Sequence, residues 1–142
     1  MAELCESWKW LDIDIKEVLF ISKMGDMFVE GNNGMVYWLA TDIGTLNMVA
    51  NSRKEFEALL KDEDNINNWF LPSLIERLIV AGKVLGRDQV YSFKKIPVIG
   101  GEYSVDNLEP IDLNVHFALT GQICEQIKDL PDGTSVKIKI VD

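Results

Sequence analysis

The tetrapeptide Gly31-Asn32-Asn33-Gly34 constrains the fold more than any other stretch of this 142-residue chain. Asparagine and glycine tolerate the positive φ angles of a tight hairpin turn, so a strand is expected on each side. Apolar runs occur at 27–29 before the turn and at 35–39 after it. Similar runs flank them, and a second turn is expected at 42–44. The sequence therefore predicts an antiparallel meander between residues 18 and 49.

Helical signals begin directly after this meander. Ser52 and Glu55 have the spacing of a capping box, which predicts that a helix starts there. The polar run 62–68 is interpreted as a loop. Pro72 is expected in the first turn of a second helix, and Gly82 is expected to end it. The segment 52–82 is therefore predicted to be mainly helical.

The last third of the chain is predicted to return to strands. Residues 96–99 form one candidate strand. Apolar and polar residues alternate from 111 to 117, which is typical of a half-buried strand. A short helix is expected around 121–128. A turn at Pro131-Asp132-Gly133 precedes another alternating run at 136–140.

Because strands and helices are segregated along the chain, we expect an α+β fold. The prediction is a single domain over residues 1–142, with a mostly antiparallel sheet and helices packed on one side. The core should hold the residues on the apolar phase of each element: Leu74, Ile75, Leu78, Ile79, Leu113, Val115, Ile138 and Ile140.

The balance of charge narrows the classes of partner. The net charge is −9, from 23 acidic against 14 basic residues. This excess disfavours nucleic acids, whose phosphates need lysine and arginine, and it disfavours anionic membranes. No apolar run approaches the roughly 18 residues of a membrane span, and the N-terminus lacks the pattern of a signal peptide. A cytoplasmic protein is therefore expected.

The acidic residues are concentrated in two stretches that lack bases. Between Lys95 and Lys128 there is no lysine or arginine, and a second such stretch runs from Lys23 to Arg53. We expect acids of the first stretch to contact a basic protein partner, although a solvated polar face is the simpler interpretation. Glu109 and Asp112 differ in strand phase and should point to opposite sides. The candidate partner-binding residues are Glu102, Asp106, Glu109 and Asp112. The second stretch carries Asp26, Glu30 and Asp42.

Patterns of catalytic chemistry are weak throughout the chain. His116 is the only histidine, and it falls on the polar face of a predicted strand, so a surface position is expected rather than a general base. Asp12 and Asp14 could pair as carboxylates, which leaves a hydrolase as a minor alternative. No catalytic residue is assigned, and no enzyme activity is expected.

Metal, cofactor and redox sites are equally unsupported. Asp62-Glu63-Asp64-Asn65 has the composition of a calcium loop, but Ile66 occupies a ligand position. The Gly100-Gly101 pair lacks the context of a phosphate-binding loop. Cys5 and Cys124 are far apart, so two reduced thiols are expected, with a disulfide as the alternative. No metal ligand and no cofactor is therefore predicted.

Two short motifs in the last third resemble a known family. They are Gly100-Gly101-Glu102-Tyr103-Ser104 with the following Asn107, and Leu130-Pro131-Asp132-Gly133-Thr134. Together with Gly25–Val29, Gly34–Leu39 and Ser52-Glu55-Phe56, they resemble the C-terminal domain of type VI secretion DNase immunity proteins. The resemblance extends from about residue 8. A more distant similarity links the chain to Smi1-like immunity domains.

The resemblance implies an immunity protein, or antitoxin, that binds a cognate toxin and neutralises it. A nuclease toxin is expected to be basic because it must hold phosphate, and an acidic inhibitor suits such a partner. Relatives often carry an N-terminal GAD-like domain for which this chain has no room, so a stand-alone form is expected. No catalytic residue is implied. The alternative is a small-ligand-binding or regulatory domain without catalysis.

Overall fold

The structure is a computed structural model that describes the backbone of residues 2–130 and the side chains of residues 6–130. Four strands form one antiparallel sheet in the order β1-β2-β3-β4. Two further strands, β5 and β6, pair antiparallel in a second sheet. The strands are β1 (Ile15–Ile21), β2 (Met27–Gly31), β3 (Val36–Ala40), β4 (Thr45–Ala50), β5 (Gln89–Phe93) and β6 (Leu108–Asp112). The predicted meander is confirmed.

The hairpin between β2 and β3 forms as its turn chemistry predicts. The amide of Gly34 donates to the carbonyl of Gly31 at 2.9 Å, and Gly34 has φ of 83°. The side chain of Asn33 accepts from the amide of Met35 at 3.0 Å. This turn fixes the register in which Met27 pairs with Leu39. A local signal of four residues thus aligns the two central strands.

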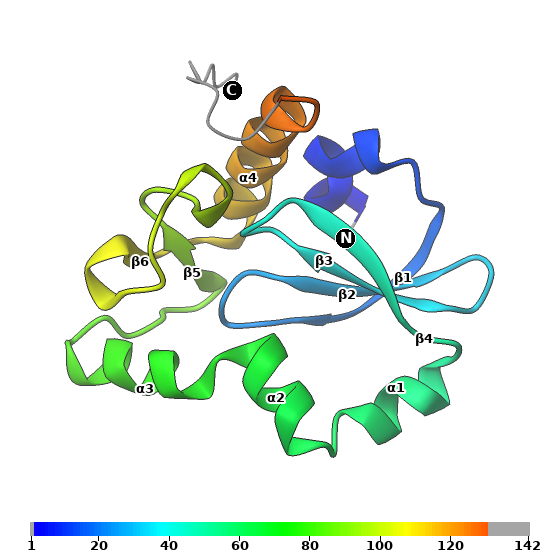
Figure 1. Cartoon of the computed structure of the whole chain (residues 1–142), viewed down its shortest axis with the longest axis horizontal. Coiled ribbons are helices and arrows are strands. Elements are labelled where there is room, and N and C mark those ends of the chain that lie inside the picture. Colours follow the sequence, from blue (N-terminus) through cyan, green and yellow to red (C-terminus); the bar gives the residue numbers. More distant parts are fainter. Residues whose placement is uncertain (1, 131–142) are drawn as a thin grey trace.

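The helices lie on both faces of the larger sheet (Figure 1). One face is covered by η1 and α4, and the opposite face is covered by α1 and α2. The described helices are η1 (Ala2–Leu11), α1 (Arg53–Leu59), α2 (Glu63–Phe70), α3 (Pro72–Val80), η2 (Pro97–Ile99), η3 (Val105–Asn107) and α4 (Leu113–Ile127). None of these helices is long and apolar enough to span a bilayer.

The α+β class and the antiparallel sheet are confirmed, whereas the helices were expected on one side only. The reason lies in β2, whose residues are buried on both faces. Met27 and Val29 face the cluster beneath η1 and α4. Phe28 faces the cluster beneath α1 and α2. A strand that is apolar in both phases needs cover on both sides.

The helical block differs from its prediction in one segment. Ser52 caps α1 as expected, with its side chain accepting from the amide of Glu55 at 3.1 Å. The polar run interpreted as a loop is instead helix α2. Its N-cap is Asp62, whose side chain accepts from the amides of Asp64 and Asn65. The acids that suggested a calcium loop therefore begin a helix.

Helix α3 follows the predicted stripe only in part. It begins at Pro72 and ends before Gly82, which has φ of 85°. Leu74 and Leu78 are buried, and the partly buried Ile75 packs against the same cluster. Ile79 was expected in the core but is 47% exposed. The buried face of α3 is therefore narrower than the apolar stripe of its sequence.

The last third differs most from its prediction. Residues 97–99 form the short helix η2 rather than a strand, and β5 was not predicted. The alternating run 111–117 is not one strand, because β6 ends at Asp112 and α4 begins at the next residue. Val115, expected in the core, is 47% exposed, whereas Leu113 is partly buried against the core. The predicted turn at 131–133 and the strand with Ile138 and Ile140 lie outside the described residues.

Candidate protein-binding site

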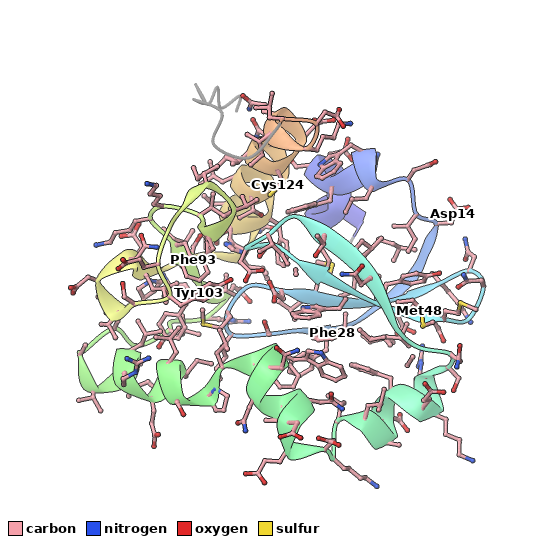
Figure 2. All side chains as sticks on the ribbon, viewed as in Figure 1. Asp14, Phe28, Met48, Phe93, Tyr103 and Cys124 are labelled. Carbon is pink, nitrogen blue, oxygen red and sulfur yellow. The ribbon has the colours of Figure 1, made fainter. Side chains whose placement is uncertain are left out.

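A pocket of about 350 Å³ opens where the β3–β4 turn, helix α2 and the segment before β6 meet. Figure 2 shows Tyr103 and Phe93 close together on this side of the molecule, with Phe28 further along between the sheet and α2. We call it the Asp26–Tyr103 pocket. Its lining residues are Met24, Asp26, Trp38, Asp42, Ile43, Asn68, Trp69, Leu71, Phe93 and Tyr103.

Asp26 lies just before β2 and is 5% exposed. One oxygen of its carboxylate, Oδ1, accepts from the amide of Thr41 at 3.0 Å. The other, Oδ2, accepts from the indole N–H of Trp38 at 3.1 Å. Burial, and then the nearby negative charge of Asp42, raises the pKa of Asp26 to about 7. Asp26 is therefore a buried acid held by neutral donors.

Asp42 occupies the turn between β3 and β4. Its Oδ2 accepts a hydrogen bond from the hydroxyl of Tyr103. Its Oδ1 is shielded from solvent and has no hydrogen-bond partner among the described residues. Burial, followed by the hydrogen bond and charge of Asp42, raises the pKa of Tyr103. The phenol therefore stays protonated and keeps donating to Asp42.

The loop that presents Tyr103 is closed by Asn107. The amide nitrogen of this side chain donates to the carbonyls of Lys95 at 2.9 Å and Glu102 at 2.8 Å. Its oxygen accepts from the amide of Lys95 at 2.9 Å. A Cβ added at Gly101 would lie 1.7 Å from the carbonyl oxygen of Lys95, so only glycine fits. The glycines and the asparagine of the motif therefore close the loop, and Tyr103 is displayed by it.

Exposed apolar side chains occur in the lining of the pocket, at Ile43 and Tyr103, and in the adjoining segment, at Val98. Ile43 is 46% exposed, Val98 is 40% exposed and Tyr103 is 45% exposed. The backbone at Val98 is held next to the β3–β4 turn because its amide donates to the carbonyl of Asp42 at 3.0 Å. The ring of Tyr103 also meets Phe93 edge-on, with centroids 5.2 Å apart. Clustered aromatic and aliphatic groups beside a pocket are typical of protein-interface anchors.

His116 is not on the surface as predicted, but only 1% exposed within α4. The prediction failed because a helical phase, unlike the assumed strand, turns His116 and Phe117 towards the core. Its Nε2 lies 2.8 Å from the carbonyl oxygen of Gly25, and its Nδ1 lies 2.8 Å from Ser92 Oγ. Burial lowers the pKa of His116 to about 4, so the ring is neutral at pH 7.

The partners of His116 fix its tautomer and its role. A carbonyl oxygen only accepts, so Nε2 carries the proton and Nδ1 accepts from the hydroxyl of Ser92. A Cβ at Gly25 would lie 2.2 Å from Nε2, which explains the glycine there. Ser92 is 7% exposed. This buried pair ties α4 to β5 and to the turn that carries Asp26, and it offers no surface to a substrate.

The four sequence-predicted site residues are all exposed and are distributed over three segments of the chain. Glu102 precedes Tyr103 in the loop, and Asp106 lies in η3. Glu109 and Asp112 lie on β6, and the Asp112 side chain caps α4 by accepting from two backbone amides. None of the four lines the Asp26–Tyr103 pocket. Their contact with a partner stays a prediction.

The stretch without bases in the sequence is not without bases in space. The ammonium of Lys83 donates to the carbonyls of Val105 at 2.6 Å and Leu108 at 2.8 Å. The second stretch is more informative, because it contributes Asp26 and Asp42 to the pocket. Its third acid, Glu30, is paired with Arg53. The aromatic residues that complete the pocket come from four separate segments, and no spacing in the sequence indicates that they meet.

One protein family matches about half of this chain. The family model described as "T6SS immunity protein Tdi1, C-terminal" matches residues 50–124, which is just over half of the chain. A search of curated proteins finds no match. The matched region supplies Tyr103 and Asn107, whereas Asp26, Trp38 and Asp42 precede it.

Among solved structures, the fold is similar to that in the crystal structure of Atu4351 from Agrobacterium tumefaciens, with a TM-score of 0.57. The sequences are 16% identical, so this likeness concerns the fold alone. The match covers 85% of the present chain and 62% of that chain. The present chain therefore corresponds to less than two thirds of the protein in that structure.

Proposed function

The chain belongs to the family of the C-terminal domain of the type VI secretion immunity protein Tdi1, and we propose that it binds a cognate toxin and blocks it. The toxin is expected to be a basic protein, such as a nuclease, and the encounter is expected to occur in the cytoplasm. The net charge of −9 would speed association with such a partner through long-range attraction. Neutralisation by this route needs contact only and no catalytic group.

The observation that carries this proposal is the apolar, aromatic rim of the Asp26–Tyr103 pocket. Ile43, Val98 and Tyr103 expose large side chains beside a pocket that contains two carboxylates. A surface of this kind combines apolar anchors with charge that selects a basic partner. The exposed acid Glu102 lies next to Tyr103 and would add to the attraction at the edge of the contact.

A second candidate function, the binding of a small apolar ligand, rests on a different pocket. A pocket of about 290 Å³ lies between η1 and the sheet, and most of its lining is apolar, including Trp8, Leu11 and Leu46. Such pockets suit small ligands. Titration with the hydrophobic dye ANS, monitored by fluorescence, tests this candidate. Saturable binding that Leu46→Trp abolishes would support it.

Co-expression tests the proposed immunity function directly. Each candidate toxin gene from the neighbourhood of this protein's gene is placed under an inducible promoter in a heterologous bacterium, with or without the protein. Growth should stop with the toxin alone and recover when both are made. The two purified proteins should then co-elute from a size-exclusion column. Equal killing with and without the protein would contradict the proposal.

The contribution of the rim is tested in the same assay. Tyr103→Ala removes an exposed aromatic anchor and should weaken rescue at limiting expression. Val80→Ala is a matched control, because Val80 is 86% exposed on α3 and does not line the pocket. Equal rescue by the wild-type protein and Tyr103→Ala would move the binding surface elsewhere without excluding the immunity function.

A further inference from the structure

The Asp26–Tyr103 pocket contains negative charge without a matching cation. Asp26 and Asp42 both line it, and none of the lining residues is basic. Within residues 6–130, neither carboxylate forms an ion pair with a lysine, arginine or histidine. Asp26 is a buried residue and Oδ1 of Asp42 is shielded from solvent, and desolvation penalises a charge that has no partner of opposite sign. The pocket is therefore electrostatically incomplete.

The missing positive charge is most evident at Asp42. Its Oδ1 is shielded from water and receives no hydrogen bond among the described residues. Its charge also opposes that of Asp26, which is one cause of the raised pKa of Asp26. A cation beside both groups would replace this repulsion by two attractions. The described residues contain no other group placed to do so.

The walls of the pocket favour a particular kind of cation. Trp38, Trp69 and Tyr103 contribute aromatic rings to the lining. Aromatic faces attract cations, and a planar guanidinium also stacks on them while it donates to a carboxylate. The volume of about 350 Å³ lies at the small end of ligand pockets. That size suits one long side chain better than a whole ligand.

A metal ion fits the pocket less well. Within the part of the chain that the structure describes, no group of three or more histidine, cysteine, aspartate or glutamate residues is placed to hold a metal. The remaining lining is apolar or aromatic apart from Asn68. Metal sites need several oxygen, nitrogen or sulfur ligands, whereas an arginine needs one or two acceptors and an apolar wall.

We propose that the Asp26–Tyr103 pocket receives one arginine side chain of the toxin. The guanidinium lies against Trp38 and Tyr103 and donates to Asp42, while Ile43 and Val98 pack against the toxin surface around it. This inference rests on the proposed immunity function for the identity of the partner. The affinity of the pocket for a guanidinium does not depend on that function and is measured separately.

The first experiment uses N-acetyl-L-arginine amide as the probe and the ¹⁵N-labelled full chain as the receptor. The indole N–H resonance of Trp38, assigned with Trp38→Phe, should shift and saturate because this group donates to Asp26 in the pocket. Asp42→Asn should weaken binding about fivefold or more through loss of a charge pair. Asp88→Asn removes one charge from an exposed acid outside the pocket and should leave binding unchanged.

A second variant keeps the test decisive if Asp42→Asn does not fold. Ile43→Lys places a cation at the mouth of the pocket on a side chain that is 46% exposed, so the fold should tolerate it. It should also weaken binding of the arginine probe. Two related probes define the chemistry: the lysine analogue should bind more weakly, and the uncharged citrulline analogue should not bind. Equal binding of all three, or no shift of Trp38, would overturn the proposal.

The second experiment uses the toxin that the co-expression assay identifies. Asp42→Asn should raise the dissociation constant of the complex about 30-fold or more, as expected when a desolvated interfacial charge loses its partner. Equal affinity of the wild-type protein and Asp42→Asn would overturn the pocket assignment and leave the immunity function standing. Failure of the wild-type protein to neutralise the toxin would reject the function, and the arginine titration would still decide the pocket.

Discussion

Asp26 and Glu30 are two buried carboxylates at opposite ends of β2, with very different surroundings. Glu30 is 7% exposed, and its Oε1 lies 2.9 Å from Nη2 of Arg53 and 3.8 Å from Nζ of Lys16. Asp26 is 5% exposed and is held by Thr41 and Trp38, with no base among the described residues beside it. The two acids are therefore buried to a similar degree, but within the described residues only Glu30 is paired with basic side chains.

This difference distinguishes Glu30, whose charge is used within the fold, from Asp26, whose charge is available to a basic partner. The charge of Glu30 is balanced by α1 and β1, so a partner would have to displace Arg53 to use it. The charge of Asp26 is balanced only by neutral donors and by uptake of a proton near neutral pH. Carboxylates at interfaces attract a basic partner most effectively when no internal base competes. On this comparison, the Asp26 end of β2 is the end that we propose as the contact surface for the toxin.

Removing Phe28 should have the largest effect, because its ring packs at the centre of the aromatic cluster between β2 and helices α1 and α2. Phe28 is fully buried and meets Phe56 and Trp69 at centroid distances of 5.1 and 5.2 Å. Phe28→Ala should lower the free energy of unfolding by about 3–5 kcal/mol, measured by urea denaturation. Phe20→Ala removes a ring that is 45% exposed and should cost much less. Equal losses would mean that the cluster is not centred on Phe28.

Asp26→Asn should change how stability depends on pH. The pKa of Asp26 rises on folding from its ordinary 3.8 to about 7, so its stabilising contribution is complete below about pH 4 and is lost as pH rises towards 7. Relative to the variant, the wild-type protein should lose at most about 1.4 kcal/mol per pH unit across this window. Urea denaturation at several pH values measures the difference.

Other titratable groups lie near Asp26, and their contribution to the pH dependence has to be separated from that of Asp26. Asp42 and Tyr103 share its pocket, and His116 contacts the same turn. The pKa of His116 falls to about 4, so its contribution has the opposite sign: it is present above pH 6.5 and lost as pH falls towards 4. Both proteins retain His116, and its effect cancels in the difference. Parallel pH profiles for the two proteins would show that Asp26 does not titrate in this range.

Asn107→Ala should affect only the pocket at the Asp26 end of β2, because Asn107 closes the loop that carries Tyr103 into the wall of that pocket. The variant loses three hydrogen bonds that close the loop. We expect a loss of about 1–3 kcal/mol in unfolding free energy, with a larger relative loss of toxin affinity. Asp106→Ala, at the exposed neighbouring residue, should change stability by less than about 0.5 kcal/mol. Unchanged toxin binding by Asn107→Ala would exclude this wall from the interface.

Arg53→Met should have the smallest effect and would leave Glu30 with a weaker compensation of its charge. The variant leaves Lys16 as the base near Glu30, at 3.8 Å. Stability should fall by less than in Asn107→Ala, because Arg53 is exposed and water can replace it. The loss should shrink at high salt, which screens the interaction in the wild-type protein. Lys54→Met removes an exposed base of the same helix and should have no comparable effect. A loss as large as that of Phe28→Ala would indicate a stronger structural role for this ion pair.

Short-range signals predicted the fold wherever a few neighbouring residues decide the backbone. The turn at 31–34 and the cap at Ser52 are of this kind, and both form as expected. The prediction failed at 111–117, because alternation suits a strand and the same residues suit an amphipathic helix capped by Asp112. The competing interpretation prevailed because α4 buries Phe117 and Cys124 against the sheet.

The candidate site was only half visible in the sequence. The absence of bases between Lys23 and Arg53 pointed to Asp26 and Asp42, although the stretch after Lys95 was preferred. Their convergence with Tyr103 depends on contacts between residues far apart in the chain, such as Tyr103 with Asp42 and His116 with Gly25. Spacing carries no information about such contacts. The pocket therefore could not be predicted from the sequence and is evident only in the folded structure.

The closure of the loop by Asn107 and Gly101 has a consequence for how the specificity of the proposed binding surface could diversify. The bonds that hold the loop run between an asparagine side chain and main-chain atoms, so they do not depend on the side chains at Val98 and Glu102. Those two positions are exposed and lie beside the pocket. New side chains there would alter the outward surface while the scaffold persists. A combinatorial library restricted to these two sites is therefore a compact starting point for changing which partner the proposed binding surface selects.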